Sequence, residues 1–138
     1  MSLTYKQAND EILSLLKAAW DPTGHKMFWE GVRDQRETDM SPWATVVVRH
    51  AAGQQDTLGG RGHRQFLRLG AVVVTINTPS SSGLSEGYNL AKVVADAYEG
   101  VSSPNGVWFR NVRINELGRE GTFFQTNVVV DFEYYETK

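Results

Sequence analysis

The first part of the chain carries apolar residues at the spacing of a helix. They recur at steps of three and four, with polar residues at most of the positions between them: Tyr5, Ala8, Ile12, Leu15, Leu16, Ala19 and Trp20. This pattern predicts an amphipathic helix with one face on the core. Pro22 disfavours helical backbone at Asp21 and has no amide to donate, so we expect the helix to end within residues 21–24.

Five later segments have the composition or the alternation of β-strands. They are residues 26–30, 42–50, 64–78, 107–116 and 122–135. The last shows period two most clearly, because one face collects Phe124, Val128, Val130, Phe132 and Tyr134. Gly70 is compatible with a bulge in the third segment, which leaves the register of strand 64–78 open. Residues 117–121 have the spacing of a hairpin turn between the last two segments.

Two polar stretches are expected to connect these elements. Residues 51–63 (AAGQQDTLGGRGH) are rich in glycine and have no apolar periodicity, which predicts a long flexible loop. Loops of this length are often functional. Residues 33–39 (RDQRETD) are all polar or charged, and we expect them to form a solvated loop.

A second helix is predicted between the two pairs of long strands. Its apolar face is expected to contain Leu84, Tyr88, Ala91, Ala95 and Tyr98, with Gly100 closing the helix and Gly87 weakening its first turn. The order is then helix, short strand, two strands, helix, two strands. This order predicts an α+β fold: a two-layer sandwich in which both helices cover one face of a mainly antiparallel sheet of about five strands.

Length and composition narrow the class of protein. The 138 residues suffice for one compact domain, 1–138, and 41% hydrophobic with 22% charged residues is typical of a globular protein. The longest apolar runs are far shorter than the roughly 20 residues that cross a bilayer, and no export signal is visible at the N-terminus, so we expect a cytoplasmic protein. The absence of cysteine excludes disulfides, thiolate zinc sites and cysteine nucleophiles.

The stretch Gly83-Leu84-Ser85-Glu86-Gly87 matches the nucleophile motif of serine hydrolases. In that fold the histidine follows the serine in the chain, whereas His25, His50 and His63 all precede Ser85. Seven residues also separate the apolar strand from Ser85, which is too long for the strained turn. We therefore favour Ser82 or Ser85 as a helix cap and keep a small serine hydrolase using Ser85 as an alternative.

Other chemistries have weaker support. The chain contains no Gly-Lys pair for a phosphate loop, and residues 60–65 lack the third glycine of a dinucleotide fingerprint. The three scattered histidines do not form a zinc motif. We expect no catalytic residues, no metal and no other cofactor.

Positive charge is concentrated in the middle of the chain. Arg49, Arg61, Arg64 and Arg68 surround one acid, Asp56, so this region has a local charge of +3 in a protein whose net charge is −2. These arginines are either ordinary surface charge or a contact for an acidic partner. The net negative charge of the whole chain disfavours a nucleic-acid-binding module.

The acidic partner could be another copy of the same protein. Asp131, Glu133 and Glu136 lie on the last predicted strand, and a contact between them and the arginines would be head-to-tail, which closes rings. Trp108 and Phe109 are adjacent and face opposite sides of a strand. If both are buried, a neighbouring subunit covers one of them.

Three sequence features together carry a family resemblance. They are Phe28-Trp29 after the first helix, Pro42-Trp43 opening a strand, and RLGAVVVTINTP at residues 68–79, which a glycine-bearing turn at 80–83 joins to the helix containing residues 91–98. The chain resembles the tail terminator proteins of long-tailed, lambda-like bacteriophages over nearly its whole length. The pattern of this family does not require a glycine within the second helix, where this chain has Gly87.

The resemblance implies a structural virion protein of the phage tail. It implies a hexameric ring that caps the tail tube, stops tube polymerisation and presents a surface to the head-completion protein, with assembly in the host cytoplasm and no catalysis. A neck or head-to-tail adaptor of the same virion is the alternative. From local charge alone, we expect Arg61, Arg64 and Arg68, with Asp131 and Glu133, to lie at an oligomer or tube interface.

Overall fold

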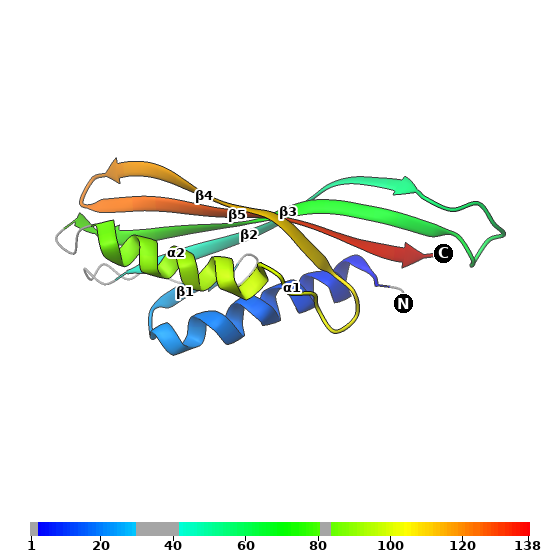
Figure 1. Ribbon diagram of the computed structural model, residues 1–138, viewed down its shortest axis with the longest axis horizontal. Helices are drawn as coiled ribbons and strands as arrows, with labels where there is room; N and C mark the ends of the chain where they lie inside the picture. Colours follow the sequence, from blue (N-terminus) through cyan, green and yellow to red (C-terminus); the bar gives the residue numbers. More distant parts are fainter. Residues whose placement is uncertain (1–2, 30–41, 81–83) are drawn as a thin grey trace.

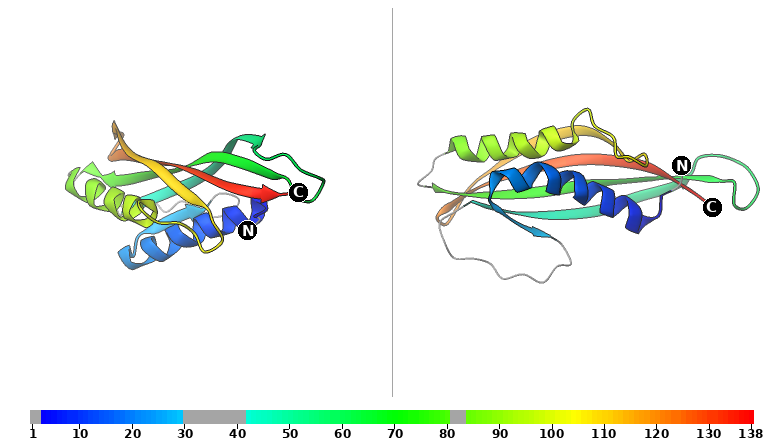
Figure 2. Two further views of the ribbon diagram at one scale, coloured as in Figure 1. Left: turned by 45° about the vertical axis from the view of Figure 1, so that its right-hand side comes forward. Right: turned by 90° about the horizontal axis from the view of Figure 1, so that it is seen from below.

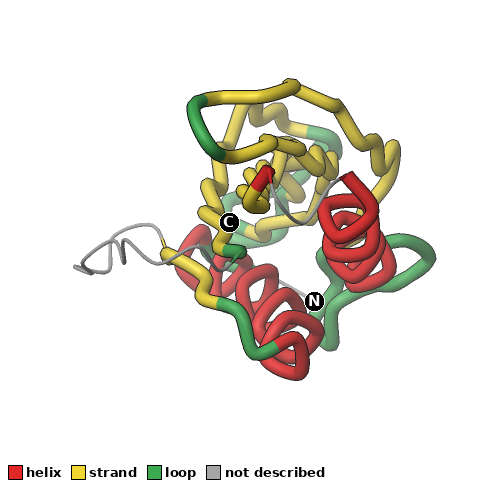
Figure 3. Tube along the Cα trace, turned by 90° about the vertical axis from the view of Figure 1, so that its left-hand side faces the viewer, coloured by secondary structure: helices red, strands yellow, loops and turns green. Residues whose placement is uncertain are grey.

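Two helices cover one face of a five-stranded sheet in the computed structural model, which describes residues 3–29, 42–80 and 84–138 (Figure 1). Seen along the long axis, the helices lie together on one side of the strands (Figure 3). The predicted two-layer α+β sandwich is therefore confirmed. Both helices run along the length of the sheet (Figure 2).

The first helix, α1 (Tyr5–Trp20), spans the predicted apolar repeat and ends just before Asp21 and Pro22. Thr4 and Gln7 form a capping box that satisfies free amides at its start. A short 3-10 turn, η1 (Asp21–Thr23), contains Pro22 and ends at Gly24, whose φ of 73° lies in the left-handed region that glycine tolerates. The buried face of α1 consists of Ala8, Ile12, Leu16 and Trp20.

The sheet has the strand order β1-β2-β3-β5-β4. Its strands are β1 (Lys26–Trp29), β2 (Trp43–Gln55), β3 (Gln65–Pro79), β4 (Trp108–Glu120) and β5 (Phe123–Thr137). Only β1 and β2 are parallel; the other pairs are antiparallel. The predicted inner face of β5 is confirmed for Val128, Val130, Phe132 and Tyr134, which are all buried.

The second helix, α2 (Leu84–Tyr98), is rotated relative to the prediction. Its buried residues are Gly87, Leu90, Ala91, Val94, Ala95 and Tyr98. Leu84 and Tyr88 were predicted on this face, but they are 49% and 42% exposed, because the contact with the sheet begins at Gly87. The Tyr98 hydroxyl donates to the Ile12 carbonyl at 2.9 Å and ties α2 to α1.

Two of the predicted connections, residues 51–63 and the turn at residues 117–121, are shorter than expected. Residues 51–55 continue β2, so the predicted loop 51–63 is wrong at its start and the connection to β3 is 56–64. In the same way β4 continues past its predicted end to Glu120, and because β5 begins at Phe123, only a tight turn lies between the two strands. Additional pairing explains both differences, since each extra residue satisfies backbone groups that a loop would leave to water. The predicted loop at 33–39 lies outside the described residues.

The irregularity expected at Gly70 is on the facing strand. Gly70 pairs with His50, and the register between β2 and β3 shifts after His50, where Ala52 pairs with Leu69. β3 itself keeps a constant alternation, with Gly70, Val72, Val74 and Ile76 buried. The register that the sequence left open is therefore regular on β3.

One end of the sheet extends beyond the helices. The β2–β3 hairpin from residue 52 to residue 69 and the end of β5 from residue 133 project to the right in Figure 1. We call residues 52–69 and 133–138 the arm. No helix of the described ranges is long and apolar enough to cross a membrane.

Candidate interaction surfaces

Ser85 does not occupy a nucleophile elbow. β3 ends at Pro79 and α2 begins at Leu84, so Ser85 is the second residue of the helix, where its side chain is exposed. The prediction that Ser85 caps α2 is wrong for the same reason, since a cap precedes the first helical residue. Ser82, the other predicted cap, lies outside the described residues.

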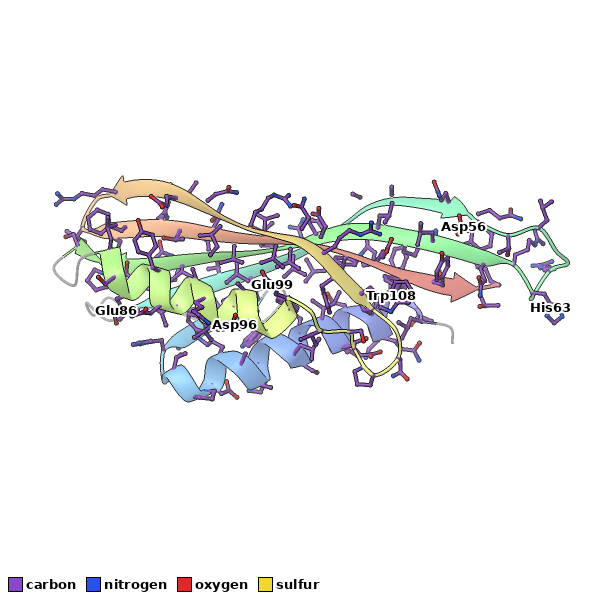
Figure 4. All side chains as sticks on the ribbon, in the orientation of Figure 1. Asp56, His63, Glu86, Asp96, Glu99 and Trp108 are labelled. Carbon is purple, nitrogen blue, oxygen red and sulfur yellow. The ribbon has the colours of Figure 1, made fainter. Side chains whose placement is uncertain are left out.

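The three histidines are distributed over different parts of the molecule. The Nε2 atom of His25 lies 3.8 Å from a carboxylate oxygen of Glu86, near the start of α2. His50 lies on β2, and His63 is exposed in the connection at the tip of the arm (Figure 4). Within the described ranges, no three His, Asp or Glu side chains gather in a way that could hold a metal ion.

Arg68 is a structural residue of the arm. Its guanidinium donates from Nε and Nη2 to one Glu136 oxygen, at 3.2 and 2.9 Å. The same group lies over the rings of Tyr5 and Phe66, at 5.5 and 5.4 Å from their centres. Because Arg68 is only 13% exposed, its charge serves the packing of β3 against β5 rather than a free surface.

The other two predicted arginines lie in the connection 56–64. Arg61 is exposed, whereas Arg64 is half-buried and exchanges two backbone hydrogen bonds with Lys138. Leu58, in the same connection, is 96% exposed. We call residues 56–64 together with Lys138 the arm end. The sequence did not indicate that Lys138 belongs with these arginines, because this depends on the register between β3 and β5.

Asp131 and Glu133 do not meet these arginines. Both face the sheet surface that the helices leave open, where Asp131 is bound by Asn111 and Arg113 and Glu133 pairs with Arg110. The structure thus divides the predicted interface residues into three groups. Arg61 and Arg64 belong to the arm end, Arg68 to the base of the arm, and the two acids to ion pairs between β4 and β5.

An aromatic cluster joins α1 to the base of the arm. The His50 ring stacks on Tyr5 at 4.2 Å, and its Nε2 lies 2.7 Å from the Tyr134 hydroxyl. Loss of hydration, followed by the positive charge of Arg68, lowers the pKa of His50 below its usual range. Burial is also the main cause of the raised pKa of Tyr134. The cluster therefore favours a neutral His50.

Trp108 and Phe109 lie on opposite faces of β4, as the sequence predicts. Phe109 packs on Tyr98, with ring centres 4.7 Å apart, but Trp108 is 55% exposed. Trp108 and Tyr135 line one side of an open hollow of about 380 Å³, and residues 102–106 line the other. Trp108 and Phe109 are therefore not both buried within this chain, which was the condition for inferring that a neighbouring subunit covers one of them.

A second apolar surface lies where α2 begins beside β4. It consists of Leu84, Tyr88, Ile114 and Leu117, which are all exposed. Glu116 lies beside Tyr88, and burial followed by the Glu116 carboxylate raises the pKa of the Tyr88 hydroxyl. We call these five residues the edge patch, because β4 is an outer strand of the sheet. The sequence pattern did not reveal this patch, because Leu84 and Tyr88 fit the spacing of a core-facing stripe.

Comparisons with known proteins identify one family. A family model described as phage tail terminator protein matches residues 9–115. No curated protein matches the chain significantly. One solved structure, whose name states no function, has 13% sequence identity and a TM-score of 0.63, over 91% of this chain and 94% of that chain. At this identity the solved structure supports the fold alone.

Proposed function

The chain belongs to the phage tail terminator family, a structural family of the virion tail, and we propose that it caps the end of the tail tube as a ring. The family match over residues 9–115 is the observation that carries this proposal. In this role the protein stops polymerisation of the tube and then presents a surface to a head-completion protein. Six copies in the ring would match a sixfold tube.

The shape of the chain supports a capping role. A cap needs a rigid body that keeps its form while it contacts several partners, and the layer of helices on the sheet supplies one. It also needs a projecting element, and the arm extends beyond the helices (Figure 1). We assign Arg61 and Arg64 of the arm end to a contact with a partner subunit or the tube, and Arg68 to the support of the arm.

Asp131 and Glu133 receive a different role in this proposal. Their ion pairs with Arg113 and Arg110 hold β4 against β5, and the same four side chains form a charged band across the open face of the sheet. Such a band contributes to the specificity of a subunit or tube contact more than to its affinity. The two acids therefore remain candidates for a subunit or tube interface.

Electron microscopy of virion particles tests the capping role. Tails produced without this protein should be overlong or remain unjoined to heads, and supplying the protein should restore their length. Tails of normal length that join heads in its absence would contradict the proposal. Cross-linking within the virion separates a cap from a neck adaptor, since a cap links to the tube protein and an adaptor links to the portal side.

A fluorophosphonate probe separates this role from the alternative of a serine hydrolase. A structural cap should give no labelling that depends on Ser85. Labelling that is present in the natural protein and lost in Ser85→Ala would instead support the hydrolase.

A further inference from the structure

The edge patch consists mainly of exposed apolar side chains from α2 and β4. It contains four of the seven large hydrophobic residues exposed in the described ranges, Leu84, Tyr88, Ile114 and Leu117, while the other three are dispersed. Ile114 pairs with Val128 and so faces the helix side of the sheet, next to α2. Grouped exposed apolar residues beside an outer strand are typical of a contact with another protein.

The arm end has the complementary character. Leu58 offers an apolar side chain that is almost fully exposed, and the arm end carries three cations, Arg61, Arg64 and Lys138, against one acid, Asp56. The edge patch offers apolar side chains around the exposed carboxylate of Glu116. Both the apolar and the charged parts of the two surfaces therefore match.

The two surfaces lie at opposite ends of the molecule. Figure 1 shows the 56–64 connection at the right end, whereas α2 begins and β4 ends at the left end. In Figure 4, His63 marks the first end and Glu86 the second. The arm end of a chain therefore cannot cover its own edge patch, but it can reach the edge patch of another copy.

We propose that the arm end of one copy binds the edge patch of the next copy, with Leu58 against Leu84 and Ile114 and with Arg61 beside Glu116. The proposal rests on the ring of the proposed function and names the contact that would build it. Because the two surfaces differ, the contact is heterologous, and its repetition closes a ring when the rotation between neighbours is suitable. Every subunit of a closed ring has both surfaces covered.

Engineered cysteines test this contact directly, because the natural chain contains no cysteine. Leu58→Cys combined with Ile114→Cys should form disulfide-linked oligomers larger than a dimer under mild oxidation. Each single variant should form at most a symmetric dimer. A ladder on denaturing gels, seen at rising protein concentration, is the expected readout.

A matched control keeps the arm cysteine and moves the second one. Ala18 is exposed on α1, so Leu58→Cys with Ala18→Cys offers the same two thiols without the proposed geometry. The proposal is overturned if the Leu58/Ile114 variant forms no more high oligomers than this control. All three positions are exposed, and thermal unfolding checks that each variant folds.

A charge exchange tests the polar half of the contact. Arg61→Glu should weaken self-association by roughly tenfold, and adding Glu116→Arg to the same chain should restore most of it. No recovery in the double variant would contradict the pairing of these two residues. The two proposals can fail separately. Restored self-association in the double variant would support the contact between copies. Normal tail length in particles lacking the protein would, independently, reject the capping role.

Discussion

Arg68 on β3 and Glu136 on β5 are linked within the arm by two hydrogen bonds of 3.2 and 2.9 Å to one carboxylate oxygen. Their side chains are only 13% and 18% exposed. Gly53 on β2 faces the Arg68 side chain so closely that a Cβ atom there would overlap the guanidinium. The pair therefore connects the three strands of the arm and gives the projecting hairpin a fixed position.

Arg68→Met should lower the free energy of unfolding by about 1–3 kcal/mol, because it leaves the half-buried Glu136 carboxylate without its partner. Urea unfolding of the purified chain measures this change. Lys6→Met is the matched control, since the Lys6–Asp10 ion pair is exposed on α1 and should add nothing measurable.

A double-mutant cycle completes the test of this pair. Arg68→Met combined with Glu136→Gln should cost less than the sum of the two single changes, because the second change removes the unpaired charge. Additive losses would show that the two side chains contribute independently, contrary to the observed contact.

Gly70→Ala should destabilise the fold by about 1–3 kcal/mol, since overpacking strains both backbone and side chains. A Cβ atom at Gly70 would clash with the Arg49 carbonyl oxygen of β2 and lie 2.5 Å from the Phe132 ring. Neither neighbour is a flexible side-chain end, so the sheet itself must shift. Thermal or urea unfolding measures the loss, and unchanged stability would contradict the close packing at this bulge.

Gly87→Ala should have the opposite effect and stabilise the chain by up to about 1 kcal/mol. Its Cβ atom would lie 3.4 Å from the Thr78 hydroxyl and 3.5 Å from the Thr126 hydroxyl, which is ordinary van der Waals contact. The gain comes from the better helix propensity of alanine. The measurement is the same as for Gly70→Ala, and a loss of stability would show that α2 needs a closer approach to the sheet.

Local patterns sufficed for much of the fold. The repeat of Ala8, Ile12 and Leu16 with the stop near Pro22 predicts α1, and the alternation from Val128 to Tyr134 predicts the inner face of β5. These signals are strong because each element packs one face on the core and leaves the other to water.

The face of α2 was harder to predict because two helical stripes compete. Leu84 and Tyr88 continue the spacing of Ala91, and their apolar character favours the core. The observed contact instead begins at Gly87 and continues through Leu90 and Val94. Large side chains of an interaction surface are thus mistaken for core residues when the partner that covers them is unknown.

The composition of the surfaces depends on pairing between distant strands. The register of β3 with β5 brings Lys138 to Arg64 and Glu136 to Phe66, beside Arg68. Bulges after His50 and after Arg110 shift the neighbouring registers. No local pattern specifies such shifts, so the sequence identified the charged residues but not the groups that they form.

Acidification should destabilise the protein through His50, whose folded-state pKa is lowered by burial and by Arg68. In the unfolded chain the imidazole binds a proton near its usual pKa of about 6.5, whereas in the folded chain it does so only at lower pH. Between these two values the unfolded state holds more protons, so the free energy of unfolding falls as the pH decreases and levels off below the folded pKa.

His50→Gln removes this titration while keeping a polar partner for Tyr134. Urea unfolding at a series of pH values should therefore show a smaller loss below about pH 6.5 for His50→Gln than for the natural chain. An identical slope in the His50 variant would mean that its protonation is not linked to folding.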